Sequence, residues 1–418
     1  MIKINKPKIR FKNFNDSWSL RKLSDTQTDF KDGNYGEAYP KETDLTSSTQ
    51  GVPFLRGSDL DNGKLTLTNA RYITQSKHNE LISGHLIEDD IVIAVRGSLG
   101  SLGYVGPDNE GWNINSQLAI IRTRKIELIG NYLIQFLLSN RGNKEISSHI
   151  TGTALKQLPI KQLKNIKVPI PKIEEQSAIG SLFRTLDDLL ASYKDNLANY
   201  QSLKATMLSK MFPKAVQTVP EIRLDGFEDE WKKAKLKDIA HRVQGNDGRM
   251  DLPTLTISAS GGWMNQIDRF SANIAGKEQK NYTLLKKGEL SYNHGNSKLA
   301  KYGVVFELKE YEEALVPKVY HSFRVNRLAD AKFIEIMFST KIPDRELGKL
   351  VSSGARMDGL LNISFDDFMN IAIIIPTIAE QQAIGSYFSN LDNLIVAHQE
   401  KISRLETLKK KLLENMFI

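Results

Sequence analysis

The chain carries the stretch IKVPIPKIEEQSAIGSLFRTLDDLLASYKDNLANYQSLKATMLSKMFP at residues 166–213 and a second copy, IAIIIPTIAEQQAIGSYFSNLDNLIVAHQEKISRLETLKKKLLENMFI, at residues 371–418. The copies align without a gap, and 19 of their 48 positions are identical. A repeat of this length indicates one duplicated structural unit. The rest of the chain falls into two segments, each of which precedes one copy.

Each copy predicts a long helix. Its apolar residues alternate spacings of three and four through almost five heptads, which is the a/d seam of a coiled coil. A helix of about 40 residues is about 60 Å long, so it needs a partner of matching length to bury that seam. The other copy is the nearest candidate. Parallel and antiparallel pairing both suit the connection, and the symmetry of a duplicated chain favours the antiparallel one.

Two local features distinguish the helices. Thr377 and Glu380 form a Thr-x-x-Glu pattern that predicts a capping box at the start of the second helix, whereas the first copy has Lys172 at the capping position. Lys204 and Lys409 interrupt the apolar seam. In an antiparallel pair each lysine could approach the acidic start of the other helix; alternatively, both extend to water.

The segments before the helices open alike. Residues 8–25 and 221–238 share Ile, Arg, Phe, Trp, Leu and Asp at one constant offset, and we expect the two tryptophans to be packing anchors. β-branched runs broken by glycines, followed by a helical pattern, predict a mixed α/β domain with a curved sheet in each segment. The predicted boundaries are 1–165 and 214–370 for these domains and 166–213 and 371–418 for the helical spacers.

The predicted fold class is therefore α+β. It comprises two mixed α/β domains with curved sheets, separated by two long helices that form an antiparallel intramolecular coiled coil. Such a molecule has pseudo-two-fold symmetry.

Composition restricts the setting and the partners. The 418 residues include no cysteine, so disulfides and thiolate metal sites are excluded. The start of the chain resembles no signal peptide, and no apolar run is long enough to span a membrane, so we expect a cytoplasmic protein with no membrane partner. The net charge is +8, and the basic excess lies in the segments before the helices. That distribution suits nucleic-acid binding, although a merely basic protein would share it.

The search for catalytic chemistry is negative. The sequence has no P-loop, no glycine fingerprint of a dinucleotide or S-adenosylmethionine site, and no Asn-Pro-Pro-aromatic motif of an amino-methyltransferase. Its seven histidines lack the spacing of metal ligands. We therefore expect no catalytic residue, no metal and no cofactor in this chain.

Recognition is the chemistry that remains. Each domain has a glycine-interrupted loop between strands, and arginine, asparagine, serine and lysine side chains on such loops read base edges or hold phosphates. Loops at equivalent places with different residues suit two readers of different sequences; two hairpin turns that have merely diverged are the alternative. The candidate DNA contacts in and around these loops are Arg56, Arg96, Ser98, Ser101, Lys156, Asn293, His294, Asn296, Lys298, Lys301 and Arg356.

The doubled pattern IPKIEEQSAIGSLFRTLD and IPTIAEQQAIGSYFSNLD, each behind an α/β segment, resembles the specificity subunit of type I restriction-modification systems. The resemblance covers the whole chain. It implies two target-recognition domains that each read one half of a bipartite, asymmetric site in double-stranded DNA, with paired helices that set the spacer.

The resemblance also implies partners. Two modification subunits would bind S-adenosylmethionine and methylate adenine, and restriction subunits would use ATP and Mg²⁺ for translocation and cleavage, so those cofactors belong to the partners. The positions it implies for subunit docking and helix pairing are Glu175, Gln176, Ile179, Phe183, Leu186 and Asp187, with Glu380, Gln381, Ile384, Phe388, Leu391 and Asp392.

Two other functions stay open from the residues alone. The chain could be a coiled-coil scaffold without a nucleic-acid role, which a lack of sequence preference in DNA binding would favour. It could also be a self-sufficient nuclease or methyltransferase, although it offers no motif for either.

Overall fold

The computed structural model describes residues 6–153, 155–214, 217–270, 276–295, 297–351 and 360–418. The chain divides into two compact units. Unit 1 contains residues 1–195 and 400–418, and unit 2 contains residues 196–399. Each unit therefore combines one α/β segment with parts of both long helices. The predicted boundaries divide the chain into consecutive segments, whereas each unit contains residues from separate parts of the chain. No helix of the described residues is long and apolar enough to cross a membrane.

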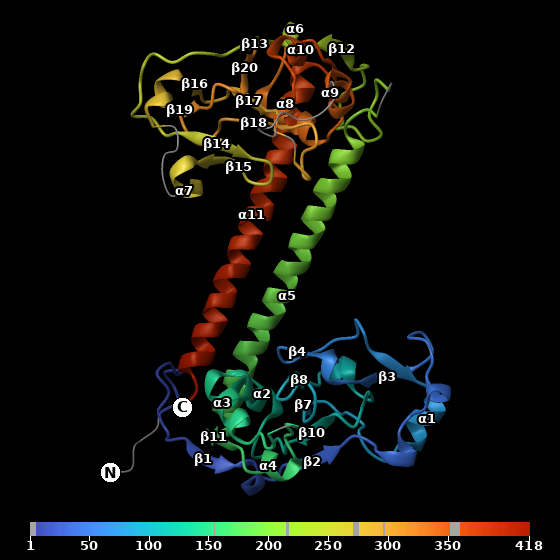
Figure 1. Ribbon diagram of the computed structural model, residues 1–418. Coiled ribbons are helices and arrows are strands. Elements are labelled where there is room, and N and C mark those ends of the chain that lie inside the picture. Colours follow the sequence, from blue (N-terminus) through green and yellow to red (C-terminus); the bar gives the residue numbers. More distant parts are fainter. Residues whose placement is uncertain (1–5, 154, 215–216, 271–275, 296, 352–359) are drawn as a thin grey trace. The chain divides into compact units, whose positions relative to one another are not determined.

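Unit 1 is built on a four-stranded antiparallel sheet with the order β2-β10-β7-β8 (Figure 1). A three-stranded sheet, β6-β3-β9, and the pairs β1-β11 and β4-β5 accompany it. The strands are β1 Ser19–Lys22, β2 Asp29–Asp32, β3 Val52–Leu55, β4 Leu60–Asp61, β5 Lys64–Leu65, β6 Arg71–Ile73, β7 Ile91–Ala94, β8 Leu102–Tyr104, β9 Asn113–Ile114, β10 Leu118–Arg122 and β11 Lys167–Ile170. The helices are α1 Gln75–Glu80, α2 Gly130–Leu138, α3 Asn140–Ser148 and α4 Ile160–Leu163.

Unit 2 repeats this plan with the sheet β13-β20-β17-β18 and the pairs β12-β21, β14-β15 and β16-β19. Its strands are β12 Lys232–Lys235, β13 Ala240–Arg242, β14 Leu255–Ser258, β15 Gly262–Asn265, β16 Thr283–Lys286, β17 Leu290–Asn293, β18 Val304–Glu307, β19 Glu313–Val316, β20 His321–Val325 and β21 Ala372–Ile375. Its helices are α6 Leu236–Ile239, α7 Gln266–Phe270, α8 Ala331–Ser339, α9 Asp344–Leu350 and α10 Phe365–Met369. The prediction of two mixed α/β domains with one common plan is confirmed.

The two copies of the repeated stretch form the long helices α5, Ile173–Lys210, and α11, Ile378–Asn415. At the start of α11 the Thr377 hydroxyl accepts a hydrogen bond from the Glu380 amide at 3.4 Å, as the capping pattern predicts. The second half of the box is different, because the Glu380 carboxylate bonds to Arg223 and Trp231 instead. Lys172 forms an exposed ion pair with Asp16 at 2.9 Å.

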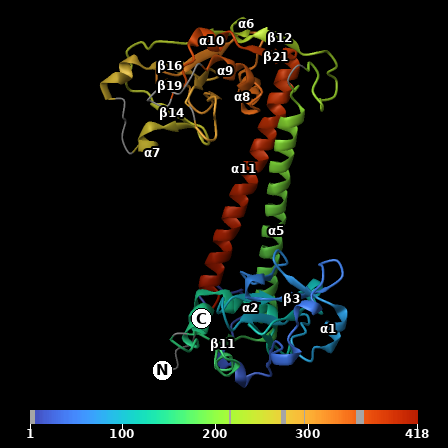
Figure 2. The same ribbon diagram turned by 45° about the vertical axis from the view of Figure 1, so that its right-hand side comes forward.

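Within unit 1 the first part of α5 lies beside the last part of α11 (Figure 2). Lys194 pairs with Glu406 at 2.7 Å, and Lys409 pairs with Asp187 at 2.5 Å. Because the residue number rises along α5 while it falls along α11, the two helices run antiparallel, as the sequence predicts. The lysine prediction had the wrong partner, since Lys409 meets Asp187, which lies in the fourth turn of the other helix.

Within unit 2 the same arrangement joins the last part of α5 to the first part of α11. The Tyr200 and His398 rings lie 5.1 Å apart, and Lys204 Nζ lies 2.5 Å from Asp392 Oδ1. Lys204 and Lys409 are therefore equivalent, and each pairs with an equivalent aspartate. The antiparallel pairing is thus present in both units.

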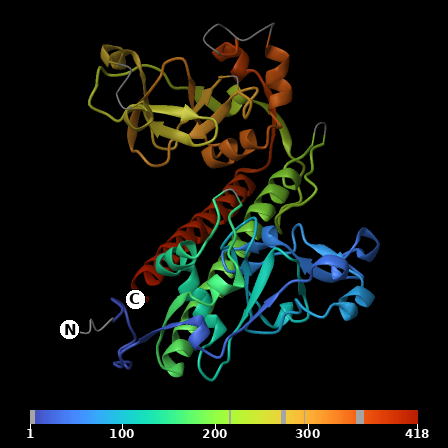
Figure 3. The same cartoon turned by 60° about the horizontal axis from the view of Figure 1, so that its bottom comes forward.

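Each unit also receives an aromatic side chain from the residues that follow a long helix. In unit 1, Phe417 lies against Phe183, with ring centroids 6.2 Å apart, and against Tyr132 at 5.8 Å. In unit 2, Phe212 stacks on Phe333 at 5.6 Å. Figure 3 shows the end of α11 beside α2 and α3 of unit 1. The segments that end the two repeats are therefore parts of the hydrophobic cores.

The opening segments complete this pattern. The amide of Ile9 donates to the Asn415 carbonyl oxygen at the end of α11, and the amide of Ile222 donates to the Lys210 carbonyl oxygen at the end of α5, both at 3.0 Å. The opening segment of each unit is therefore hydrogen-bonded to the last turn of a long helix, α11 in unit 1 and α5 in unit 2.

Candidate nucleic-acid interface

Buried glutamates fasten each α/β segment to the start of its long helix. Arg10 donates two hydrogen bonds of 2.7 Å to the Glu175 carboxylate, and Trp18 Nε1 donates a third at 3.0 Å. In unit 2, Arg223 donates two hydrogen bonds to the Glu380 carboxylate, and Trp231 Nε1 donates a third. Both tryptophans are buried, which confirms that they are packing anchors.

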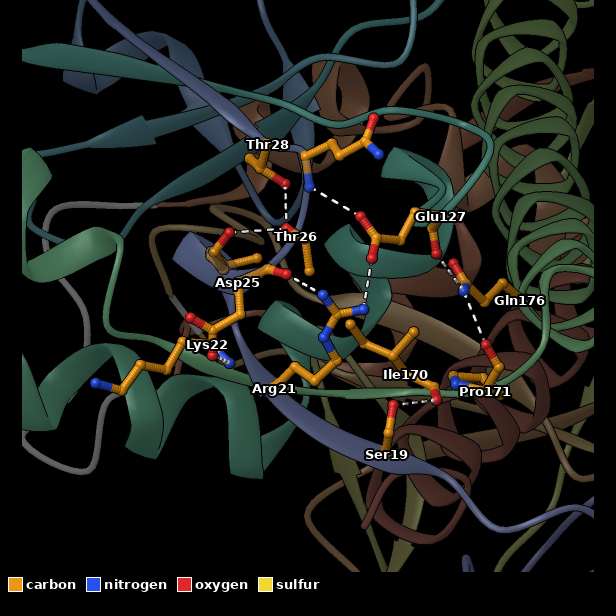
Figure 4. Close-up of polar contacts among 12 residues, drawn as sticks. Ser19, Arg21, Lys22, Asp25, Thr26, Thr28, Glu127, Ile170, Pro171 and Gln176 are labelled. Atoms are coloured by element: carbon orange, nitrogen blue, oxygen red, sulfur yellow. Dashed lines mark hydrogen bonds and ion pairs between the residues drawn. The ribbon is translucent and has the colours of Figure 1, made fainter.

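The neighbouring glutamines make a second attachment. Gln176 donates from Nε2 to the carbonyl oxygens of Glu127 and Pro171 at 3.0 Å and accepts from the Ile129 amide at 2.9 Å. Figure 4 shows Glu127 between Gln176 and Arg21, to which its carboxylate pairs at 2.5 Å. The equivalent Gln381 bonds to the backbone of Leu328, Pro376 and Asp330.

The twelve positions predicted for subunit docking and helix pairing lie at or near these contacts. Ten of them are buried: Glu175, Gln176, Ile179, Phe183, Leu186, Glu380, Gln381, Ile384, Phe388 and Leu391. The other two, Asp187 and Asp392, pair with seam lysines. The ten buried positions pack within the units, and the two aspartates join the helices. Docking of partner subunits at these positions stays a prediction.

The predicted recognition loop of unit 1 follows β7. The amides of Val95 and Arg96 both donate to the Gln117 carbonyl oxygen, at 2.9 and 3.2 Å, and the Gly100 amide donates to the Ala94 carbonyl oxygen at 2.9 Å. Gly97 has φ 72°, a left-handed conformation that favours glycine. Arg96 and Ser98 are exposed on this loop, and Ser101 is half-buried.

Two other segments lie against this loop. A Cβ atom on Gly57, which follows β3, would lie 3.6 Å from Ser98 Cβ, and the Leu158 amide donates to the Val95 carbonyl oxygen at 3.1 Å. Two backbone hydrogen bonds of 2.9 Å join Thr151 to Gln157, the residue that follows Lys156. The structure therefore brings the surroundings of Arg56, Arg96, Ser98 and Lys156 together, although these residues span a hundred positions of sequence.

The basic side chains around this loop differ in how far other protein groups already engage them. Arg56 is engaged, because its Nη2 donates to the Asn69 carbonyl oxygen at 2.5 Å and its Nε lies 3.6 Å from Asp59. Lys156 is exposed. The guanidinium carbon of Arg96 lies 5.4 Å from the centre of the Tyr35 ring. Tyr35 therefore lies beside the recognition loop, and no motif or spacing in the sequence indicates it.

Unit 2 gathers the same three segments around the loop that follows β17. Asn293 donates from Nδ2 to the Ile257 carbonyl oxygen at 3.3 Å, which joins the loop to β14. The Leu361 amide donates to the His294 carbonyl oxygen at 2.9 Å, which joins it to the segment before α10. Lys298 and Lys301 are exposed, whereas Asn296 and Arg356 lie outside the described residues.

The structure corrects the prediction that His294 contacts DNA. Its side chain is buried, and its Nδ1 and Nε2 atoms lie 2.8 Å from the carbonyl oxygens of Leu361 and Val319. Its ring also stacks on His321, with centroids 4.7 Å apart. Burial lowers the pKa of His321 to about 4. Both histidines therefore support the loop from within, and neither ring is available to a base.

The backbone match between the two loops identifies where they diverge. Val95 and His294 receive equivalent hydrogen bonds from Leu158 and Leu361, so the residue after each is equivalent too. That residue is Arg96 in unit 1 and Gly295 in unit 2. The supporting scaffold is shared, and the exposed side chains differ.

The described residues give no sign of a catalytic centre. Within them, no group of three or more His, Cys, Asp or Glu residues is placed to hold a metal ion. Burial raises the pKa values of Glu307 and Glu335, but both carboxylates lie beside Lys309. These two carboxylates form a charged cluster with Lys309 within unit 2.

Comparisons with known proteins agree with this geometry. The family described as "Type I restriction modification DNA specificity domain" matches the chain twice, over residues 17–199 and 228–407. The type I restriction enzyme MjaVIII specificity subunit of Methanocaldococcus jannaschii is 22% identical over 285 residues, which cover 64% of this chain and 65% of that protein. The EcoBI specificity subunit of Escherichia coli is 27% identical over 175 residues, which cover 39% of this chain and 35% of that protein.

The match to a third relative, the putative type I restriction enzyme MjaX specificity subunit of Methanocaldococcus jannaschii, covers 52% of that protein. The chain therefore spans between about a third and two thirds of the length of these curated relatives. Among solved structures, the type I restriction-modification system S subunit from M. genitalium has a TM-score of 0.60 at 15% identity, with 99% of each chain covered. This likeness shows that the two chains share a fold.

Proposed function

Because the chain belongs to the family of type I restriction modification DNA specificity domains, we propose that it is the DNA-recognition subunit of a type I restriction-modification complex. Unit 1 reads one half of a bipartite site in double-stranded DNA, and unit 2 reads the other half. Adenine methylation and cleavage belong to partner subunits, which bring S-adenosylmethionine, ATP and Mg²⁺.

The observation that carries this proposal is the shared scaffold with different loops. Each unit collects the same three segments beside the loop after β7 or β17, and the residue after the matched hydrogen bond is the exposed Arg96 in one unit and the half-buried Gly295 in the other. Base edges are read by side chains of this kind, whereas phosphate contacts supply affinity without sequence information. One scaffold with two sets of side chains suits the recognition of two different half-sites.

The long helices supply a surface for partners. In unit 1, Asp187 and Glu406 line a hollow together with Asp61 and Asn62 of the recognition segment, so this edge of the helix pair faces its own recognition segment. In unit 2, Asp392 lines a hollow together with Lys332 of α8. The opposite edge of the pair, by helical periodicity, is free to face a partner.

That opposite edge carries exposed leucines at equivalent positions. They are Leu189 and Leu408 in unit 1 and Leu394 and Leu203 in unit 2, with 37–44% of each residue exposed. The ion pair of Lys409 with Asp187 sets a register that places Leu189 opposite Leu408, and the pair of Lys204 with Asp392 places Leu203 opposite Leu394. Two like apolar patches suit two copies of one partner, which we assign to the modification subunits.

Exchange of one recognition segment tests the proposal. The complex of this chain with its modification subunits is compared with one in which residues 26–165 come from a relative of different specificity. We expect the methylated motif to change in one half-site only. A change in both halves, or in neither, would contradict the assignment of one half-site to each unit.

A further inference from the structure

Arg96 and Tyr35 form an exposed pair beside the loop that follows β7 in unit 1. The Arg96 guanidinium carbon lies 5.4 Å from the centre of the Tyr35 ring, and both residues are exposed, Tyr35 by 43%. A guanidinium over an aromatic face is attracted by the ring quadrupole. The pair thus has contacts that fix it while its outer surface remains open to a ligand.

The backbone beneath both residues is tightly held. Arg96 follows the end of β7, and its amide donates to the Gln117 carbonyl oxygen. Two residues before Tyr35, a Cβ atom on Gly33 would lie only 2.2 Å from the Asn115 carbonyl oxygen, so the chain passes close to the backbone that follows β9. The buried Asn34 side chain donates to the Ser83 carbonyl oxygen at 2.7 Å.

The Tyr35 side chain is held at its far end as well. Its hydroxyl donates to the Ser116 carbonyl oxygen at 3.1 Å, one residue before the Gln117 that receives the Arg96 amide. The ring therefore lies between a fixed backbone and the guanidinium, and it restricts the directions in which the Arg96 fork can point. A long side chain that is already ordered loses less conformational entropy when it binds.

From this geometry we propose that Arg96 reads a guanine in the half-site of unit 1 and that Tyr35 is the positioning residue that orients its guanidinium for that contact. The planar fork of arginine matches the O6 and N7 acceptors of guanine in the major groove. Arg56 is less suited, because a backbone carbonyl oxygen already occupies its guanidinium. Lys156 presents a point charge that suits a phosphate.

In unit 2, among the residues that the structure describes, Gly295 occupies the position of Arg96 and cannot supply an equivalent guanidinium. The guanine requirement should therefore belong to one half-site only. This inference rests on the proposed function, and the experiment distinguishes the two.

The test uses the full chain in complex with its modification subunits and measures methylation of duplexes in which each base pair of the motif is changed in turn. Arg96→Ala and Arg96→Lys should each lower the preference for guanine at one position by about 5- to 150-fold and leave the other half-site unchanged. Tyr35→Ala should weaken the same preference, and Tyr35→Phe, which keeps the ring, should retain most of it.

Arg124→Ala is the matched control, because Arg124 is exposed and follows the opposite end of β10. It should leave every base preference unchanged. The inference is overturned if Arg96→Ala keeps the guanine preference, or loses methylation equally on all sequences. A wild-type complex that methylates no bipartite motif would overturn the proposed function instead, and this inference with it.

Discussion

Arg10 donates two hydrogen bonds of 2.7 Å to the carboxylate of Glu175, although 165 residues separate the two in the chain. The pair is buried, with side-chain exposures of 12% and 2%. Unit 2 repeats it with Arg223 and Glu380. These two contacts join each recognition segment to the start of a helix, which is the junction on which the position of the recognition loops depends.

Glu175→Gln should destabilise unit 1 strongly. The change leaves the Arg10 guanidinium and the Trp18 indole beside a neutral amide, and breaking a buried ion pair on one side costs about 3–5 kcal/mol. Denaturant unfolding measures the loss, and Glu380→Gln should reproduce it in unit 2. Lys172→Ala, which removes an exposed pair with Asp16, is the control and should change stability little. Equal effects of Glu175→Gln and Lys172→Ala would contradict the role of the buried pair.

Unit 2 should lose stability in mild acid because of His321. Burial lowers its pKa to about 4, below the ordinary value of about 6.5, so the folded state binds its proton less readily than the unfolded state. The contribution is fully present above about pH 6.5 and is lost as the pH falls toward 4, by about 3 kcal/mol.

Unfolding of the wild type and of His321→Asn across this pH range checks that prediction. The variant should show a flatter pH dependence, whatever its stability at neutral pH. His241→Asn, at an exposed position of β13, should keep the wild-type slope. An unchanged slope in His321→Asn would mean that other groups cause the acid sensitivity.

The leucine patches predict the number of bound partners. Leu189→Ser with Leu408→Ser removes the patch of unit 1, and Leu203→Ser with Leu394→Ser removes that of unit 2. Because all four leucines are exposed, the fold should tolerate the changes. Native mass spectrometry should show one modification subunit bound to each double variant and two bound to the wild type. Two partners bound to both double variants would place the docking surface elsewhere.

The length of the helices should set the spacer between half-sites. Insertion of one heptad into both α5 and α11, at the boundary between the units, adds about 10.5 Å of helix, or about three base pairs of DNA. The methylated motif should gain that spacing and keep both half-site sequences. Altered half-site sequences would contradict the separation of reading and spacing.

The periodic and duplicated parts of this structure could be predicted from the sequence. The heptad pattern predicted α5, α11 and their pairing, because a long apolar seam needs a partner of equal length, and the symmetry of the duplicated chain favoured the antiparallel direction. The matched openings, with Trp18 and Trp231, indicated two domains of one plan. These features depend on local periodicity and on comparison of the chain with itself.

Contacts between distant, aperiodic residues could not be predicted. The sequence showed Glu175 as an acidic helix start and not as the partner of Arg10, and it did not indicate that Tyr35 lies beneath Arg96. His294 is of a residue type expected on a recognition loop, yet its ring faces inward to two backbone carbonyl oxygens. Only the path of the backbone decides which side chains of a loop are exposed.

The central claim is that the two units read two different half-sites for a methyltransferase. Mapping of methylated adenines across the genome, in cells that carry the gene and in cells that lack it, tests this claim most directly. The account predicts a motif with two specified parts and an unspecified spacer that disappears when the gene is removed. Methylation that is unchanged by removal of the gene, or a gene-dependent motif without two separate parts, would contradict it.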